Sequence, residues 1–279
     1  MKIALPFAKN ASAASRERTL RAVAALGALL LAACGNNTTQ VSAANAEGLV
    51  TAGKSALQAA TLSDAEVVQL SERSCAEVDA SSKIAAPKSK YALRLAKIVK
   101  GMPKEVNGVS INYKVYETKE VNAWAMNNGC VRVYSGLMEK MNDNELRGVI
   151  GHEIGHVALG HSKKAMQVAY AAGAARQAAA SAGNSAVAAL TASEIGDLAE
   201  KLVNAQFSQA QETEADDYAF DLLTTAKLKR DGLVTAFEKL AKLGDNSSML
   251  SSHPASSERA QHIRDRLSAE KTAGKVVKQ

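Results

Sequence analysis

The stretch that most limits how this chain can fold is "GHEIGHVALGHS", residues 151–162, which holds three of the chain's five histidines. Residues four apart lie on one face of a helix, so a helix here would point His152 and His156 at a single ion. Glu153 would lie about 100° around that helix, where it could reach a water on the ion without binding the ion itself. Asn142 and Glu145 have the spacing of a capping box and begin the helix upstream. The pattern predicts a helix that presents two metal ligands and a proton acceptor.

The HExxH arrangement is typical of a zinc hydrolase, and two imidazoles favour zinc over magnesium or calcium. We therefore expect one zinc ion per chain. A catalytic zinc needs a third protein ligand and an open fourth position. The metzincin pattern would supply the third ligand from the same segment, but it requires glycine at 159 and histidine at 162. Leu159 and Ser162 stand there and exclude that class. The third ligand must be a carboxylate or a histidine further along the chain.

The segment "ETEAD", residues 212–216, offers two carboxylates four residues apart on one helical face. We predict Glu212 as the third ligand and Asp216 as the acceptor of a hydrogen bond from a ligand imidazole. Glu214 would point elsewhere. His161 lies five residues after His156, about 140° around a continuous helix, and is expected to be structural or at the surface. His262 is expected at the surface.

The rest of the chain favours an α+β fold that is mostly helical. The apolar residues, 47% of the chain, are mainly Ala, Leu and Val with few aromatics, which favours helices. Ser63 and Glu66 have the spacing of a capping box for a helix to about Val78. Alternating apolar and polar residues predict a small antiparallel or mixed sheet. The expected helices lie near 91–102, 165–207, 209–223, 234–243 and 256–267, with a loop at 244–254, and the strands near 110–117, 121–126 and 130–134.

The N-terminus has the features of an exported lipoprotein. Residues 1–21 are basic, and the apolar stretch that follows is about twelve residues long, too short to span a bilayer. It predicts a signal peptide at 1–33. "LAAC", ending at Cys34, resembles a bacterial lipobox, in which the cysteine is acylated. An ordinary secretory signal with an incidental cysteine is the alternative.

The residues around this cysteine also predict a location. Gly35 and Asn36 follow it where an aspartate would favour the inner membrane. By resemblance the protein is expected on the outer membrane, anchored by lipid on Cys34 and facing the periplasm. Residues 34–60 would form the lipidated end and a flexible tether.

Charge argues against a nucleic-acid partner. The net charge is +6, but Lys2, Lys9, Arg16, Arg18 and Arg21 against Glu17 leave about +4 in the N-terminal segment alone. The metallopeptidase domain is expected at 61–269. The basic tail that follows it, 270–279, is expected to be solvated and frayed.

The number of cysteines is consistent with an exported protein. With Cys34 lipidated, Cys75 and Cys130 remain. Because the periplasm is oxidising, we expect them to form a disulfide between an N-terminal helix and the strand region. Two buried free thiols are the alternative.

The segments "HEIGHVALGH", "ETEAD" and "SHPASSER" resemble the gluzincin metallopeptidase family that includes HtpX, BepA and the Oma-type proteases. The resemblance covers about residues 62–268. It implies zinc ligands at His152, His156 and Glu212, with Glu153 as the catalytic glutamate.

The resemblance adds roles that spacing alone does not supply. A His-Pro motif with an arginine six residues after the histidine maps to His253 and Arg259. His253 would either stabilise the oxyanion or close the site as a fourth ligand at rest. Asn122 and Ala123 match the strand that pairs with substrate backbone. One departure is Gln209, where the family often has arginine, so no orienting role is carried over for that position.

The implied activity is that of a zinc metalloendopeptidase acting on polypeptides of the cell envelope in protein quality control. The implied partners are another protease or outer-membrane assembly components. The alternative is a non-catalytic assembly or binding lipoprotein, in which four protein ligands would make the zinc structural.

Overall fold

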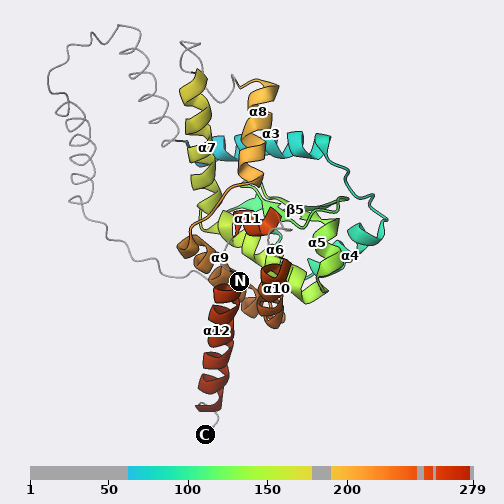
Figure 1. Cartoon of the computed structure of the whole chain (residues 1–279), viewed down its shortest axis with the longest axis vertical. Coiled ribbons are helices and arrows are strands. Elements are labelled where there is room, and N and C mark those ends of the chain that lie inside the picture. The colour runs from blue at the N-terminus through green and yellow to red at the C-terminus, as the bar shows by residue number, and fades with distance from the viewer. Residues whose placement is uncertain (1–61, 178–189, 244–247, 254–255, 277–279) are drawn as a thin grey trace, which may run out of the picture. The chain divides into compact units, whose positions relative to one another are not determined.

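The computed structural model describes residues 62–177, 190–243, 248–253 and 256–276 (Figure 1). The expected signal peptide, the tether and the lipidation site Cys34 lie outside the described residues. So does 178–189, the middle of the Ala-rich segment. In the part of the chain that is described, no helix is long and apolar enough to cross a membrane.

The described fold is mostly helical, as predicted, and several of its helices begin at a capping residue. Ser63 and Glu66 form the expected capping box, and Asn142 and Glu145 form another at the start of the HExxH helix. The helices are α3 (Asp64–Ser81), α4 (Lys90–Ile98), α5 (Ser135–Lys140), α6 (Asp143–Ala158), α7 (His161–Gln177), α8 (Ala192–Val203), α9 (Gln209–Thr225), α10 (Asp231–Leu243), α11 (Ser248–Ser252) and α12 (Ser256–Val276).

Three strands form the small mixed sheet that the alternation predicted: β3 (Asn112–Tyr116), β4 (Ala123–Ala125) and β5 (Cys130–Tyr134). Their order is β3-β5-β4, with β5 parallel to β3 and antiparallel to β4. The sheet order leaves β4 at an edge. A further hairpin joins β1 (Glu105–Val106) to β2 (Val109–Ser110) through a turn at Asn107 and Gly108, both with positive φ. These two-residue strands are too short for an alternating pattern, so the sequence did not predict them.

Helix α6 lies at the centre of the main core, and two of its glycines let other helices approach closely. A Cβ at Gly155 would lie 2.9 Å from the carbonyl oxygen of Ala215 on α9. A Cβ at Gly148 would lie 3.1 Å from the side chain of Leu233 on α10. Larger side chains would push the helices apart. The close approach of α6 and α9 is what brings the HExxH residues beside those of "ETEAD".

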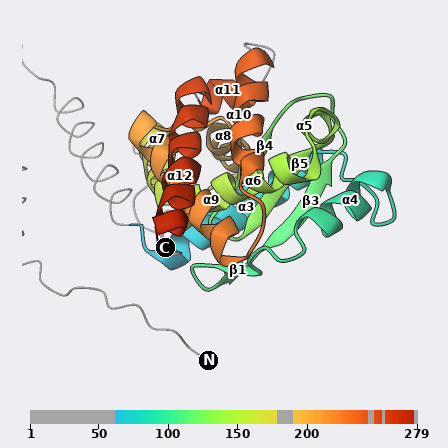
Figure 2. The same ribbon diagram turned by 90° about the horizontal axis from the view of Figure 1, so that it is seen from below.

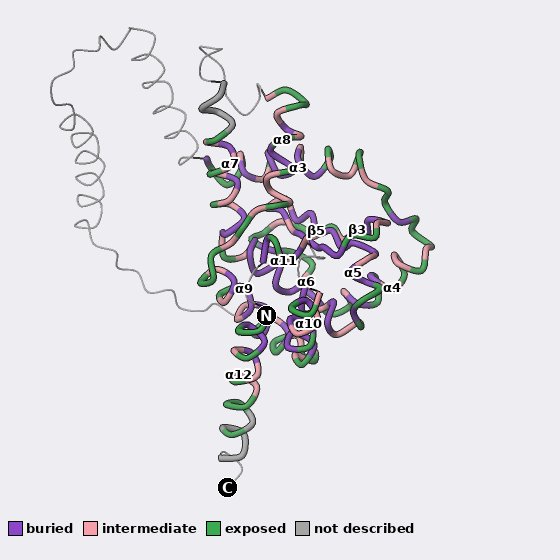
Figure 3. The backbone as a smooth tube through the Cα atoms, in the orientation of Figure 1, coloured by how far each residue is buried: buried purple, intermediate pink, exposed green. Residues whose placement is uncertain are grey.

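Helices α3, α7 and α8 form a second layer with its own small core, at the top of Figure 1. Its buried apolar residues are Leu62, Val67, Leu70, Met166, Tyr170, Ile195 and Leu198. Helix α7 also packs on α6. The burial colouring shows buried residues concentrated where α6 lies, and mostly exposed ones along the outer part of α12 (Figure 3).

Several predicted boundaries differ from the structure. The helix expected near 91–102 ends at Ile98, and α8 ends at Val203, before the end of the helical segment expected at 165–207. The short helix α11 lies inside the segment 244–254, which was expected to be a loop. Helix α12 continues to Val276, into the segment expected as a frayed tail, and its C-terminal part extends below the other helices in Figure 1. In Figure 2, which is seen from below, α12 lies in front of the other helices. The residues SAEKTAGKV contain no proline to end the helix, and Ala, Glu and Lys are good helix formers.

The expected disulfide between Cys75 on α3 and Cys130 on β5 is confirmed, with a Cα–Cα distance of 6.6 Å. Beside it, the buried Arg132 makes two hydrogen bonds to Asp79, at 2.8 and 2.9 Å. Burial by itself raises the pKa of Asp79, but hydrogen bonds from Arg132, Lys114 and Tyr116 outweigh it and hold that pKa well below its usual range. A covalent bond and a charged network thus fix α3 to the sheet.

Candidate metal centre

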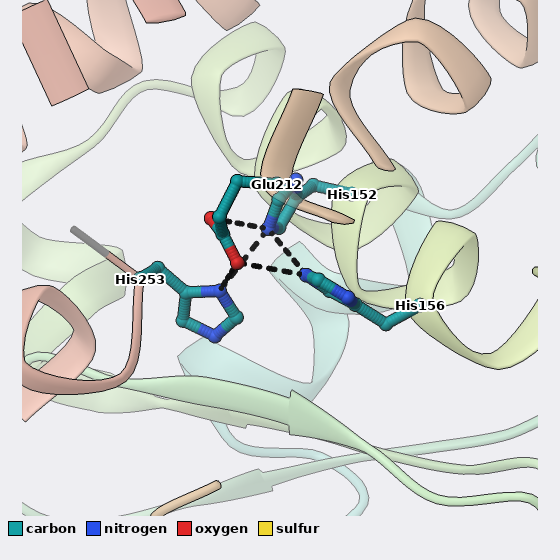
Figure 4. Close-up of side chains that lie close together, drawn as sticks. All are labelled: His152, His156, Glu212 and His253. Carbon is teal, nitrogen blue, oxygen red and sulfur yellow. Dashed lines mark hydrogen bonds and ion pairs between the residues drawn. The ribbon is translucent and has the colours of Figure 1, made fainter. Parts of the chain in front are cut away.

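Four buried side chains meet between α6, α9 and the end of α11: His152, His156, Glu212 and His253. Each offers one ligand atom, and these atoms all lie within 4.8 Å of one another. Figure 4 shows the Glu212 carboxylate between His253 and the two imidazoles of α6. Residues more than forty positions apart in the chain therefore share one small space, and the "ETEAD" segment lies beside the HExxH helix.

The distances within this group are those of atoms that face a common centre. The Nε2 atoms of His152 and His156 are 3.0 Å apart. Glu212 Oε1 lies 3.2 Å from His156 Nε2 and 2.9 Å from His253 Nδ1. His253 Nδ1 also lies 3.2 Å from His152 Nε2. Three histidine nitrogens and a carboxylate oxygen are a donor set that zinc binds.

The protonation states of the ligand side chains also allow them to bind a metal ion. Burial lowers the pKa of His156 to about 4 and that of His152 well below its ordinary value, which keeps both imidazoles neutral and able to bind metal. Burial acts to raise the pKa of Glu212, but hydrogen bonds with His156 and His253 hold it well below its usual range. Glu212 Oε2 is buried and accepts no hydrogen bond, although it is ion-paired with Arg259. Glu212 Oε1, which faces the imidazoles of His156 and His253, is therefore the oxygen placed to bind a metal ion.

Asp216 lies at the Nδ1 side of His152, and Arg259 connects Asp216 to the carboxylate of Glu212. Asp216 Oδ1 lies 2.8 Å from His152 Nδ1. Arg259 binds both oxygens of Asp216, at 2.6 and 2.7 Å, and its Nη1 lies 2.5 Å from Glu212 Oε2. If His152 binds metal through Nε2, its Nδ1–H donates to Asp216. Arg259 then balances the charge of two carboxylates that water does not reach.

His161 does not lie on a continuous helix with His156. Helix α6 ends at Ala158, Gly160 takes a left-handed φ of 78°, and α7 begins at His161. This break turns His161 back, so that its Nδ1 lies 3.0 Å from His156 Nδ1. The side chain is buried rather than at the surface. Glu214 points away from the ligand group, as expected, and its Oε2 lies 3.0 Å from His161 Nε2. The more exposed His262 pairs with Asp217.

Glu153 is the buried carboxyl beside the ligand group. Burial is the main cause that raises its pKa to about 7. Its Oε1 lies 3.6 Å from His253 Nε2 and has no hydrogen-bond partner. A carboxyl whose pKa lies near neutrality can accept and return a proton at physiological pH.

A cavity lies next to Glu153, His156 and His253. Its free volume is about 20 Å³, which is enough for about one water molecule. Trp124 and the β4 end of the sheet line it, together with residues of α3, α7 and α8. Phe207, in the segment between α8 and α9, stacks on His156 with ring centroids 3.8 Å apart. No sequence pattern predicted the position of Phe207, and the one hint was its place five residues before Glu212.

The predicted substrate-binding residues lie at the edge of the sheet that borders this cavity. The carbonyl of Asn122 accepts a hydrogen bond from Tyr134 of β5, and Met126 N–H donates to Cys130. In an antiparallel pair such residues alternate, so the backbone groups of Ala123 and Ala125 point away from β5. The side chain of Asn122 accepts from the N–H of Ala123. The N–H of Ala123 is thus already paired, which leaves the carbonyl of Ala123 and the backbone groups of Ala125 on the side away from β5.

Comparison with known proteins agrees with this arrangement. Residues 89–267 match peptidase family M48. The chain is 57% identical to metalloprotease LoiP of Escherichia coli K12 over 228 residues, which cover 81% of this chain and 90% of LoiP. It is 53% identical to metalloprotease YcaL of the same strain over 224 residues, 80% of this chain and 88% of YcaL. A 37-residue segment, 13% of this chain, is 60% identical to 12% of protease HtpX from Acinetobacter baumannii AYE. The chain therefore belongs to peptidase family M48 and is a metalloprotease.

Proposed function

We propose that this metalloprotease is a zinc-dependent endopeptidase whose zinc is held by His152, His156 and Glu212. The observation that carries the proposal is the buried group of ligand atoms within 4.8 Å of one another, beside a glutamate with a pKa near 7 and space for one water. A structural zinc site would need no such glutamate, so the non-catalytic alternative explains less of the geometry.

Each side chain around the cavity would have its own role in peptide hydrolysis. A bound zinc ion would supply Lewis acidity to the peptide carbonyl and the attacking water. Glu153 accepts the proton of that water and delivers it to the leaving amine. His253 Nδ1 lies among the ligand atoms, which supports the role of a fourth ligand at rest. His253 would have to withdraw from that position before it could stabilise the oxyanion.

Substrate would bind in an extended conformation along β4. The carbonyl of Ala123 and the backbone groups of Ala125, which point away from β5, can pair with a peptide, as in strand addition to a sheet edge. Trp124, Ala125 and Met126 line the cavity at Glu153, so a peptide on this edge would pass the proton acceptor. Because the cavity holds about one water, some of the residues that line it must move to admit a peptide.

We propose that the enzyme is a lipoprotein of the outer membrane that faces the periplasm and acts on envelope proteins in quality control. The support is the apolar segment before Cys34 together with the disulfide, which fits an oxidising compartment. Mass spectrometry of the mature protein should find acylated Cys34 as its first residue. A mature chain that begins elsewhere, or an unmodified Cys34, would contradict the lipid anchor.

Metal removal tests the proposed activity. The purified full-length chain should cleave casein, lose at least about 90% of this activity on chelation, and regain it with stoichiometric zinc. The unfolding temperature should be measured on the same samples. Activity that survives complete loss of zinc would refute the proposal, and so would a folded zinc-loaded protein that cleaves neither casein nor a mixture of peptides.

A further inference from the structure

We propose that His161 and Glu214 form a hydrogen-bonded pair that orients the ligand imidazole of His156. The inference rests on the proposed function, because it assumes that His156 binds zinc through Nε2. His156 Nε2 faces the ligand group, 3.0 Å from His152 Nε2. Its other nitrogen, Nδ1, faces away and lies 3.0 Å from His161 Nδ1. His161 Nε2 in turn lies 3.0 Å from Glu214 Oε2.

These contacts allow one arrangement of protons when His156 binds metal through Nε2. The Nδ1 of His156 then carries its proton and donates to His161 Nδ1. A neutral His161 that accepts at Nδ1 must carry its own proton on Nε2, where it donates to Glu214. Each ring nitrogen of His161 thus has a partner, and the side chain itself is only 7% exposed. A residue that merely filled space here would not need both contacts.

The two ligand imidazoles are therefore held by different partners. His152 is held by Asp216, a buried carboxylate that Arg259 neutralises. His156 is held by a neutral imidazole that connects to a carboxylate 62% exposed to solvent. A hydrogen-bond partner on the outer nitrogen fixes the tautomer and orientation of a metal-binding histidine. The stacked ring of Phe207 fixes the plane of His156 but offers no acceptor to its Nδ1–H.

The break between α6 and α7 is what makes this contact. On a continuous helix, His161 would lie about 140° from His156 and could not face it. The left-handed φ of Gly160 ends α6 and places His161 at the first position of α7. The turn thus puts an acceptor behind the second histidine of the HExxH motif.

Two substitutions at His161 can show whether it positions the His156 imidazole through a hydrogen bond or only fills space. In His161→Asn the side-chain oxygen can occupy the place of Nδ1 and still accept from His156, whereas in His161→Gln the amide lies nearer the place of Nε2. We expect zinc affinity, measured on the full-length chain by competition with a chromophoric chelator, to fall about 10- to 100-fold for His161→Gln. His161→Asn should stay within about 3-fold of the wild type. The visible spectrum of the cobalt-substituted protein should change with Gln and be retained with Asn.

Glu214→Ala provides a second variant, because an exposed side chain is removed without disturbing the core. It should weaken zinc binding a few-fold, less than His161→Gln. His262→Gln is the matched control, a histidine also paired with an acidic residue, and should leave zinc affinity unchanged. Wild-type zinc affinity in both His161→Gln and Glu214→Ala would overturn the inference, as would equal losses for Asn and Gln. A wild-type chain that binds no zinc would refute the proposed function and this inference together.

Discussion

Glu153→Gln should lower kcat/KM for peptide cleavage by about a thousand-fold or more while zinc remains bound. General acid–base catalysis contributes typically about 10² to 10⁴ in rate, and here one carboxyl would serve both proton transfers. The amide of Gln has nearly the same shape but cannot accept the proton of the attacking water. Because Glu153 Oε1 has no hydrogen-bond partner, the substitution should cost little stability. A fluorogenic peptide assay and a zinc determination on the same preparation measure both quantities.

The matched control for this variant is Glu139→Gln, which changes an exposed carboxylate paired with Lys90 and should leave kcat/KM unchanged. The unfolding temperature of Glu153→Gln should be at or slightly above that of the wild type. Cleavage at the wild-type rate by the zinc-loaded variant would remove Glu153 from the mechanism. Loss of zinc together with activity would instead make this residue a support of the metal site.

The features that the sequence predicted well depend on short-range spacing. The capping boxes at Ser63 and Asn142 involve residues three positions apart, and both are present. Glu212 and Asp216 share a helical face, and both reach the HExxH helix from α9. Such patterns are readable because local geometry decides which side chains can act together.

Long-range contacts could not be predicted in the same way. Alternation predicted two or three strands but not that β5 lies between β3 and β4, because pairing depends on residues far apart in the chain. The pair between Arg132 and Asp79 joins a strand to a helix fifty-three positions away, and neither residue has a local pattern that marks it.

The position of His161 shows how one backbone angle can change an interpretation. Helical spacing places it away from His156, and only the left-handed φ of Gly160 reverses that result. A glycine two residues after the last helical position is a known stop signal, so the sequence contained a hint. What it could not show is the direction in which α7 leaves the turn, since this depends on packing against α8 and α6.

Arg259→Met should reduce the free energy of unfolding of the zinc-free protein by about 3 to 5 kcal/mol. Removing one member of a buried ion pair leaves its partner charged and away from water. Arg259 contacts two such partners, Asp216 and Glu212, and its guanidinium also lies 4.1 Å above the ring of Phe237. Urea unfolding at neutral pH measures the loss. Arg264→Gln, on the same helix, removes a partly exposed pair with Glu238 and should cost less than about 1 kcal/mol.

The loss in Arg259→Met should also depend on pH and on Asp216. Burial raises the pKa of Asp216 above its ordinary value even with Arg259 beside it, and removing the cation raises it further. A carboxyl with a higher pKa in the folded than in the unfolded state binds its proton more tightly when folded, so protonation favours folding. The difference from the wild type should therefore shrink as the pH falls through the folded pKa of Asp216. Adding Asp216→Asn should recover part of the stability at pH 7, because it removes the unpaired charge while keeping an acceptor for His152. Equal losses at all pH values, or no recovery in the double variant, would show that Arg259 stabilises the site by packing rather than by charge.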